Sequence, residues 1–245
     1  MTVTVDLARP ARVLAIGAHP DDIEFGCGAS LAKWSDGGAV VYLCVCTDGS
    51  KGTWDTNADL GALVATREQE QRDAANLLGA VDVRFLRRID GQLTDDLATR
   101  AQVCAAIREL RPDVVLGHDP WRSYRLHPDH REAGRLVVNG IVAARDPHFF
   151  AEQGLAPFRP ETLLLFEPAA VGHVERIDAY LDRKAAALLA HRSQWRSTMS
   201  IDDRDERQVD DQRAAFVAGV RDTARLNGLR AGVRGGEAFA RIDDL

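Results

Sequence analysis

The sequence contains little cysteine and no long apolar segment. Its four cysteines, at positions 27, 44, 46 and 104, include no pair with CxxC spacing, which argues against a disulfide framework and favours buried free thiols. No apolar run approaches the roughly 20 residues that a membrane-spanning helix needs. Residues 1–12 also lack the continuous apolar segment of a signal peptide. These absences lead us to expect a soluble, cytoplasmic protein.

The sequence also has fewer positively than negatively charged residues. Against 31 lysines and arginines stand 37 aspartates and glutamates, for a formal net charge of -6. An acidic protein is a poor partner for nucleic acid or an anionic membrane, so we expect neither. No internal repeat, low-complexity tract or linker is visible either. We therefore expect one α/β domain over 1–245, with its core at about 12–195 and a helical extension at 196–245.

What the sequence does contain is a repeated alternation of buried strands and helices. Such alternation is typical of a Rossmann-like, doubly wound and mostly parallel sheet with helices on both faces. Three polar stretches, at 48–61, 118–126 and 146–160, are expected to be loops. The expected strands are 13–16, 39–47, 81–86, 112–117, 161–167 and a short one at 174–177, and the expected helices are 26–34, 63–78, 95 or 96 to 110, 127–144, 179–195 and 209–226, before a short final segment at 237–242.

Polar side chains gather after the first and fourth of these strands. His19-Pro20-Asp21-Asp22 follows the first strand, and His127-Pro128-Asp129-His130 opens the helix after the fourth. In the common strand order 3-2-1-4-5, the first and fourth strands are neighbours, and the crevice at this switch point is where ligands bind. The two loops are therefore expected to face each other across one cleft.

The residue types in these loops indicate a catalytic metal site. Zinc in such sites takes three ligands from histidine and carboxylate and leaves a position for water, and His19, Asp22 and His130 supply such a set. Bound zinc lowers the pKa of that water, and Asp21 can then act as general base. His127 can assist a developing oxyanion. Iron, manganese or cobalt would also suit these ligands.

Simpler explanations exist for each motif. Asp21 or Asp22 can merely cap the following helix, and His127 and His130 can lie on an exposed helix surface. A nucleotide-binding module is disfavoured because the first turn lacks GxGxxG and carries two carboxylates that would repel a pyrophosphate. A metal-free carbohydrate-binding protein is a further alternative, which bound metal would exclude.

The motifs also resemble those of a known family. AHPDDIEFGCG at 18–28, TDG at 47–49 and HPDH at 127–130 are similar to the PIG-L/LmbE-like family of zinc-dependent N-deacetylases, which act largely on N-acetylglucosaminyl compounds. The similarity spans roughly 13–195. It implies His19, Asp22 and His130 as zinc ligands, Asp21 as general base, His127 as the assisting histidine, and Arg67 and Asp90 as substrate contacts. The implied partner is a small-molecule N-acetyl sugar derivative.

The chain departs from the family pattern in two places. Ile23 follows Asp22 where HPDDE is frequent, which displaces the acid to Glu24. Where some members place an oxyanion-stabilising tyrosine, this chain has Arg125, preceded by Tyr124, so the donor is left open between them or to neither. Arg67 can also be an exposed helix residue, and the alternative function is a hydratase or amidase that uses the same metal site. Surface or helix-packing roles are expected for His148, His173 and His191.

Overall fold

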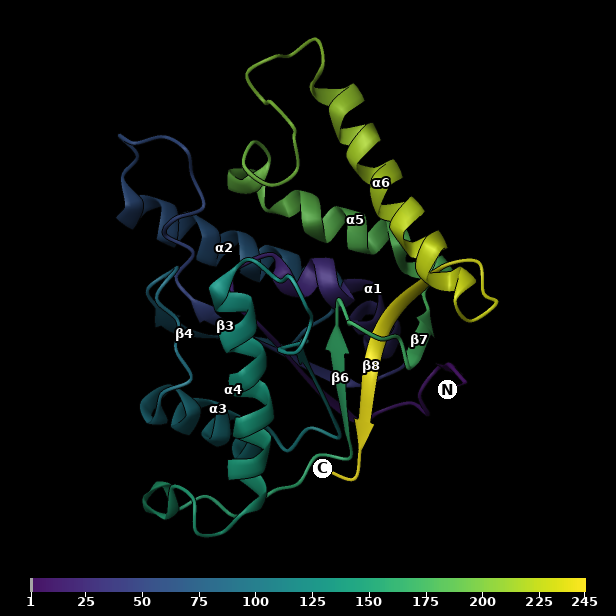
Figure 1. Ribbon diagram of the computed structural model, residues 1–245. Coiled ribbons are helices and arrows are strands. Elements are labelled where there is room, and N and C mark those ends of the chain that lie inside the picture. Colours follow the sequence, from purple (N-terminus) through teal and green to yellow (C-terminus); the bar gives the residue numbers. More distant parts are fainter. Residues whose placement is uncertain (1) are drawn as a thin grey trace.

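The computed structural model describes residues 2–245 as an eight-stranded sheet between two layers of helices. Among these residues, none of the helices combines the length and apolarity needed to cross a lipid bilayer. The elements are β1 (Thr4–Val5), β2 (Arg12–Gly17), α1 (Asp22–Asp36), β3 (Val40–Thr47), α2 (Leu60–Leu78), β4 (Asp82–Arg88), α3 (Leu97–Leu110), β5 (Val114–His118), α4 (Pro128–Arg145), β6 (Thr162–Phe166), β7 (His173–Arg176), α5 (Leu181–Ala190), α6 (Val209–Leu229) and β8 (Gly236–Asp243), with 3₁₀ turns at Ala151–Gln153, Asp178–Tyr180 and Arg192–Gln194 (Figure 1).

The strand order is β1-β7-β8-β6-β5-β2-β3-β4. Its central part, β4-β3-β2-β5-β6, is parallel and reproduces the expected order 3-2-1-4-5. β8 alone runs antiparallel, between β6 and β7. The expected doubly wound, mostly parallel α/β sheet is therefore confirmed, and the C-terminal strand adds a pairing that the sequence did not indicate. The single-domain interpretation stays a prediction.

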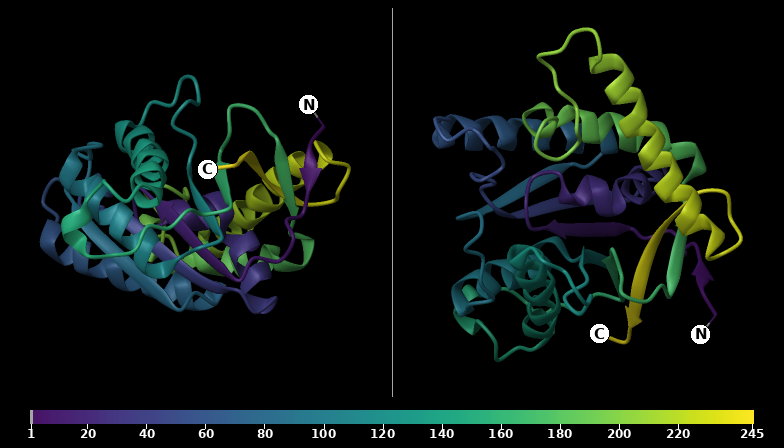
Figure 2. Two further views of the ribbon diagram at one scale, coloured as in Figure 1. Left: turned by 90° about the horizontal axis from the view of Figure 1, so that it is seen from below. Right: turned by 45° about the horizontal axis from the view of Figure 1, so that its top comes forward.

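The two faces of the sheet bury alternate residues of the same strands. Leu14 and Ile16 of β2 pack with α3 and α4, whereas Val13 and Ala15 pack with α1 and α2. Figure 2 shows these helix layers on opposite sides of the sheet. All four cysteines are buried and free, as expected.

Helix boundaries differ from expectation mainly where polar residues begin a helix. α1 starts at Asp22 rather than at 26, because acidic residues in the first turn are favourable at the positive end of the helix dipole. α2 starts at Leu60, within the expected loop, since the Asp59 carboxylate accepts the Ala62 N–H. Asp96, not Asp95, caps α3. The helix expected at 179–195 ends at Ala190 and continues as a 3₁₀ turn.

Candidate metal and catalytic site

The site lies where β2 and β5 end side by side. β2 pairs directly with β5, so the turn at 19–22 and the start of α4 meet at one edge of the sheet. His19 and Asp22 come from the first segment and His127 and His130 from the second. The cleft that the sequence predicts between the two motifs is thus present in the structure, as a cavity of about 540 Å³ lined by residues of both.

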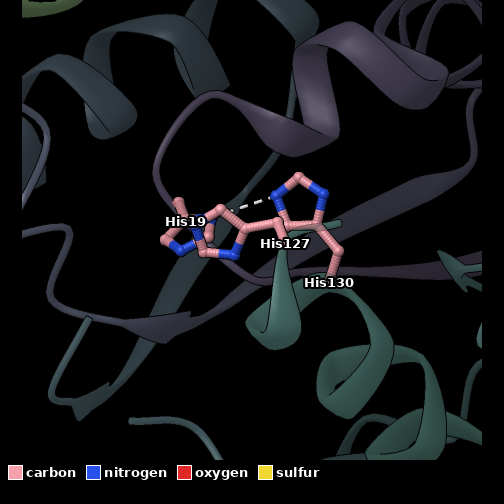
Figure 3. A group of neighbouring side chains, drawn as sticks. All are labelled: His19, His127 and His130. Carbon is pink, nitrogen blue, oxygen red and sulfur yellow. Dashed lines mark hydrogen bonds between the residues drawn. The ribbon is translucent and has the colours of Figure 1, made fainter. Parts of the chain in front are cut away.

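The three predicted metal ligands converge on one point. His19 Nδ1 lies 3.2 Å from Asp22 Oδ2. His130 Nε2 lies 3.3 Å from His19 Nδ1 and 3.3 Å from Asp22 Oδ1. His127 joins them, since its ring centroid is 4.6 Å from that of His19 and 4.8 Å from that of His130 (Figure 3). His130 is half-buried; His127 is exposed, as the simpler explanation expected, but its ring lies beside those of His19 and His130.

Two further carboxylates hold the far side of His19. Its Nε2 lies 3.2 Å from Asp129 Oδ2 and 3.2 Å from Asp90 Oδ1. Asp129 is itself fixed by the N–H groups of Gly91 and Leu93. Burial alone would lower the pKa of His19, but the hydrogen bonds to Asp129, Asp22 and Asp90 raise that pKa well above its usual value. Sequence reasoning missed Asp129 in this role, although it stands inside the HPDH motif.

Asp21 and Asp22 are neighbours in sequence, but their pKa values are shifted in opposite directions. Burial raises the pKa of Asp21 to about 6, although the Arg67 guanidinium and nearby histidines oppose the shift. Burial also raises the pKa of Asp22, but His130 and His118 outweigh it and hold the pKa well below its usual value. One chain segment thus presents a carboxyl that binds a proton readily beside a carboxylate that resists one.

Asp21 is held in an unusual backbone conformation. Its φ is 109°, in the left-handed region that side-chain-bearing residues rarely occupy, and such strain is concentrated at functional sites. Asp21 precedes α1, but its side chain makes no capping hydrogen bond. The Asp22 carboxylate accepts the N–H of His19 at 2.7 Å, at the start of α1. Helix capping therefore does not account for Asp21.

Arg67 is buried beside Asp21 rather than exposed on α2. It is 3% exposed, its Nη2 lies 3.6 Å from Asp21 Oδ2, and it donates hydrogen bonds to the carbonyls of Pro20 and Gly49. The alternative of an exposed helix residue is wrong. Asp90, also buried, accepts the Lys51 N–H in addition to its contact with His19. Both residues line the cavity.

A buried pair lies behind Asp21 in a place that the sequence did not indicate. His191, expected at the surface or in helix packing, is fully buried with its Nε2 3.5 Å from Glu24 Oε2. Gln71 connects this pair to the site, because it donates to Glu24 Oε1 and accepts the N–H of Asp21. Of the other two histidines in that expectation, His173 is buried on β7 and His148 is exposed.

His118 and Arg125 are site residues that sequence reasoning did not assign. His118 ends β5, is 1% exposed, and has its Nε2 3.3 Å from Asp22 Oδ2. Arg125 places Nη1 2.9 Å from His130 Nδ1 and pairs with Glu167 at 2.6 Å. Tyr124 is 97% exposed. Arg125 therefore occupies the site and Tyr124 does not. The signal for His118 was its position as the last residue of a buried strand that ends at this edge.

Comparison with known proteins finds a matching family and relatives that are all named as deacetylases. The family model described as PIG-L, GlcNAc-PI de-N-acetylase, matches residues 14–141. Over 187 residues the chain is 32% identical to a diacetylchitobiose deacetylase of Thermococcus kodakarensis, which covers 75% of this chain and 70% of that protein. It is 30% identical over 184 residues to a 1D-myo-inositol 2-acetamido-2-deoxy-alpha-D-glucopyranoside deacetylase of Kineococcus radiotolerans, covering 62% of this chain and 51% of the relative.

Solved structures agree with this assignment. The N,N'-diacetylchitobiose deacetylase of Pyrococcus horikoshii, solved with its inhibitor MPG, superposes with a TM-score of 0.84 at 30% identity. The match covers 96% of this chain and 84% of that one. It therefore includes the C-terminal region beyond the segment that the family model matches.

Proposed function

Because this chain belongs to the PIG-L family of GlcNAc-PI de-N-acetylases, we propose that it hydrolyses the amide of an N-acetylglucosaminyl compound with zinc bound by His19, Asp22 and His130. The relatives that support this are named as deacetylases of N-acetylglucosamine derivatives. They do not favour the hydratase or amidase alternative. The reaction adds water across the amide and releases acetate and a primary amine.

The observation that carries the proposal is the spacing of the donor atoms of these three residues. His19 Nδ1 and His130 Nε2 lie 3.3 Å apart, and each lies 3.2–3.3 Å from one oxygen of the Asp22 carboxylate, Oδ2 for His19 and Oδ1 for His130. The edge of a tetrahedron around a zinc ion with bonds of about 2.0–2.1 Å is about 3.3–3.4 Å. Two imidazoles and one carboxylate are also a common zinc donor set, with a fourth position left for water or substrate. The residues therefore fit a zinc ion.

The roles of the other residues follow from their positions. Zinc, when bound, supplies Lewis-acid polarisation and lowers the pKa of water. Asp21 accepts a proton from the attacking water and returns it to the departing amine nitrogen. His127 donates a hydrogen bond to the oxygen on which negative charge develops. Arg67 holds Asp21 in place, and Arg67 and Asp90 bind the sugar from one side of the cavity.

The proposal is tested by metal analysis coupled to a primary-amine assay. We expect the purified protein to contain close to one equivalent of zinc and to release acetate and amine in equal amounts from an N-acetyl sugar panel. Chelation should lower turnover at least 100-fold, and added zinc should restore it. Circular dichroism before and after chelation provides the control for unfolding. Full turnover by protein verified as metal-free would refute the metal-dependent mechanism.

A further inference from the structure

A second cavity adjoins the catalytic one and has no part in the chemistry described above. It measures about 660 Å³ and lies under α6, between the start of α1 and the segment after β6. Figure 1 shows α6 slanting past α5 and ending near the start of β8. Phe25 and Glu167 line both cavities, so the two share a boundary. The apolar part of the wall is made by Phe25, Pro168, Val171, Phe216, Val220 and Ala224.

A glycine lines one wall of this α6 cavity. Gly219 lies in the middle of α6, where glycine costs roughly 0.5–1 kcal/mol relative to alanine. A Cβ at Gly219 would meet no atom within 4 Å, so packing does not require the glycine. Gly26, on the opposite wall, differs, because a Cβ there would lie 2.5 Å from the Phe166 ring. Position 219 therefore has room for a larger side chain.

The charged groups of the wall are mostly neutralised within the protein. Lys184 pairs with Glu237 at 2.6 Å. Glu167 pairs with Arg125 at 2.6 Å and lies 3.7 Å from Arg122. Arg230, Thr223 and Asn227 also line the cavity, and the apolar side chains make up most of the remaining wall. The cavity therefore suits an apolar group better than a polyhydroxylated one.

The strand order fixes which part of the substrate points toward this cavity. Along the edge of the sheet, Asp90 follows β4, the metal ligands follow β2 and β5, and Glu167 follows β6. The proposed sugar contacts Arg67 and Asp90 thus lie on the β3/β4 side of the ion, and the α6 cavity lies on the β6/β8 side. An amide whose sugar lies on the first side has its acyl group on the second.

We propose that the α6 cavity binds the acyl group of the substrate, and that the enzyme removes acyl chains longer than acetyl from N-acylated amino sugars. This inference rests on the proposed function. Water adds to the acyl carbon, the C–N bond breaks, and both protons of the water end on the nitrogen. The sugar leaves as the protonated primary amine, and the acyl chain leaves as a carboxylate from the α6 side.

The test is a series of N-acetyl, N-butyryl, N-hexanoyl and N-octanoyl glucosamines assayed with the zinc-loaded enzyme. We expect kcat/KM to rise up to about fourfold for each methylene that becomes buried, the factor equivalent to about 0.8 kcal/mol per CH₂. Gly219→Phe fills the cavity and should lower the hexanoyl-to-acetyl ratio of kcat/KM at least 10-fold. Ala218→Phe is the matched control, since this neighbouring residue is exposed and does not line the cavity.

The outcomes separate the two proposals. If acetyl is removed but longer acyl groups are not, or if Gly219→Phe leaves the ratio unchanged, the acyl assignment is wrong and the deacetylase proposal stands. A second series keeps the acyl group constant and varies the group on the anomeric oxygen among methyl, phenyl and a second sugar. If Gly219→Phe changes the ratios of kcat/KM within this series instead, the cavity binds that group and the acyl inference is refuted. If no amide is cleaved by zinc-loaded protein, the proposed function itself fails. Melting temperatures of both variants identify any that do not fold.

Discussion

The catalytic cluster and a cluster at the β1/β7 edge both bury histidine with carboxylates, but the charges of these carboxylates are balanced in different ways. At the β1/β7 edge, Glu175 accepts hydrogen bonds from His173, from the Leu7 N–H and from Lys33 Nζ, the last at 2.6 Å. Asp6 accepts from the same Lys33 and from Arg176. Each carboxylate in this edge cluster faces a permanent cation of the chain.

The catalytic cluster lacks such compensation. Asp22, Asp90 and Asp129 contact His19, and Asp21 lies in the same cluster. Among residues 2–245 the one ion pair of these four carboxylates with a lysine or arginine is Arg67–Asp21 at 3.6 Å. The remaining partners are imidazoles, which are neutral when they bind a metal. A bound divalent cation would therefore supply at the catalytic cluster the positive charge that Lys33 and Arg176 supply at the edge cluster.

The largest expected effect comes from removing the negative charge of Asp21. Asp21→Asn should lower kcat by roughly 10²–10⁴-fold, the usual contribution of a general base, while zinc content stays unchanged. Stability should not fall, because burial raises the pKa of Asp21 and so makes its ionised form costly in the folded state. Asparagine also tolerates a positive φ.

Metal analysis, amine release and urea unfolding check this prediction. Turnover equal to that of the unmodified protein would show that Asp21 is not the base. If the variant lost stability but kept full activity, Asp21 would have a structural role, like the carboxylates of the edge cluster, and not a catalytic one.

The next effect is expected at the edge cluster, on stability rather than activity. Glu175→Gln removes a fully buried charge and leaves Lys33 with less compensation, which should lower the free energy of unfolding by about 3 kcal/mol. Deacetylation by the folded variant should not change. Asp210→Asn is the matched control at an exposed carboxylate, with an expected effect below about 0.5 kcal/mol. Urea denaturation measures both, and equal effects would contradict the assignment.

The sequence was sufficient to predict which loops meet. Apolar runs such as 13–16, and 114–116 within the strand expected at 112–117, indicate buried parallel strands, and the order of these strands places His19, Asp22 and His130 together. These predictions succeeded because they depend only on which segments are strands, and the pattern of apolar residues identifies strands well. Asp129, by contrast, acts on His19 through a contact between side chains 110 residues apart, which no local pattern reports.

The C-terminal part of the chain was harder to predict for a different reason. β8 pairs antiparallel with β6 and β7, so its place in the sheet depends on edges that other segments create. The α6 cavity likewise results from the packing of α6, α1 and the segment after β6. His191 became visible only through its burial, because an isolated histidine carries no spacing signal.

The smallest expected effect is the pH dependence of the edge cluster. Burial would raise the pKa of Asp6, but Lys33 and Arg176 outweigh it and lower the pKa to about 2. A carboxylate whose pKa is lower in the folded state stabilises above its unfolded pKa, near 4, and loses this contribution as the pH falls toward 2. Asp6→Asn should therefore cost about 1 kcal/mol at pH 7, after allowance for solvent screening, and less at each step from pH 4.5 to 3. Urea unfolding of both proteins at each pH measures the difference. A difference that stays constant on acidification would mean that Asp6 contributes through its shape and not through its charge.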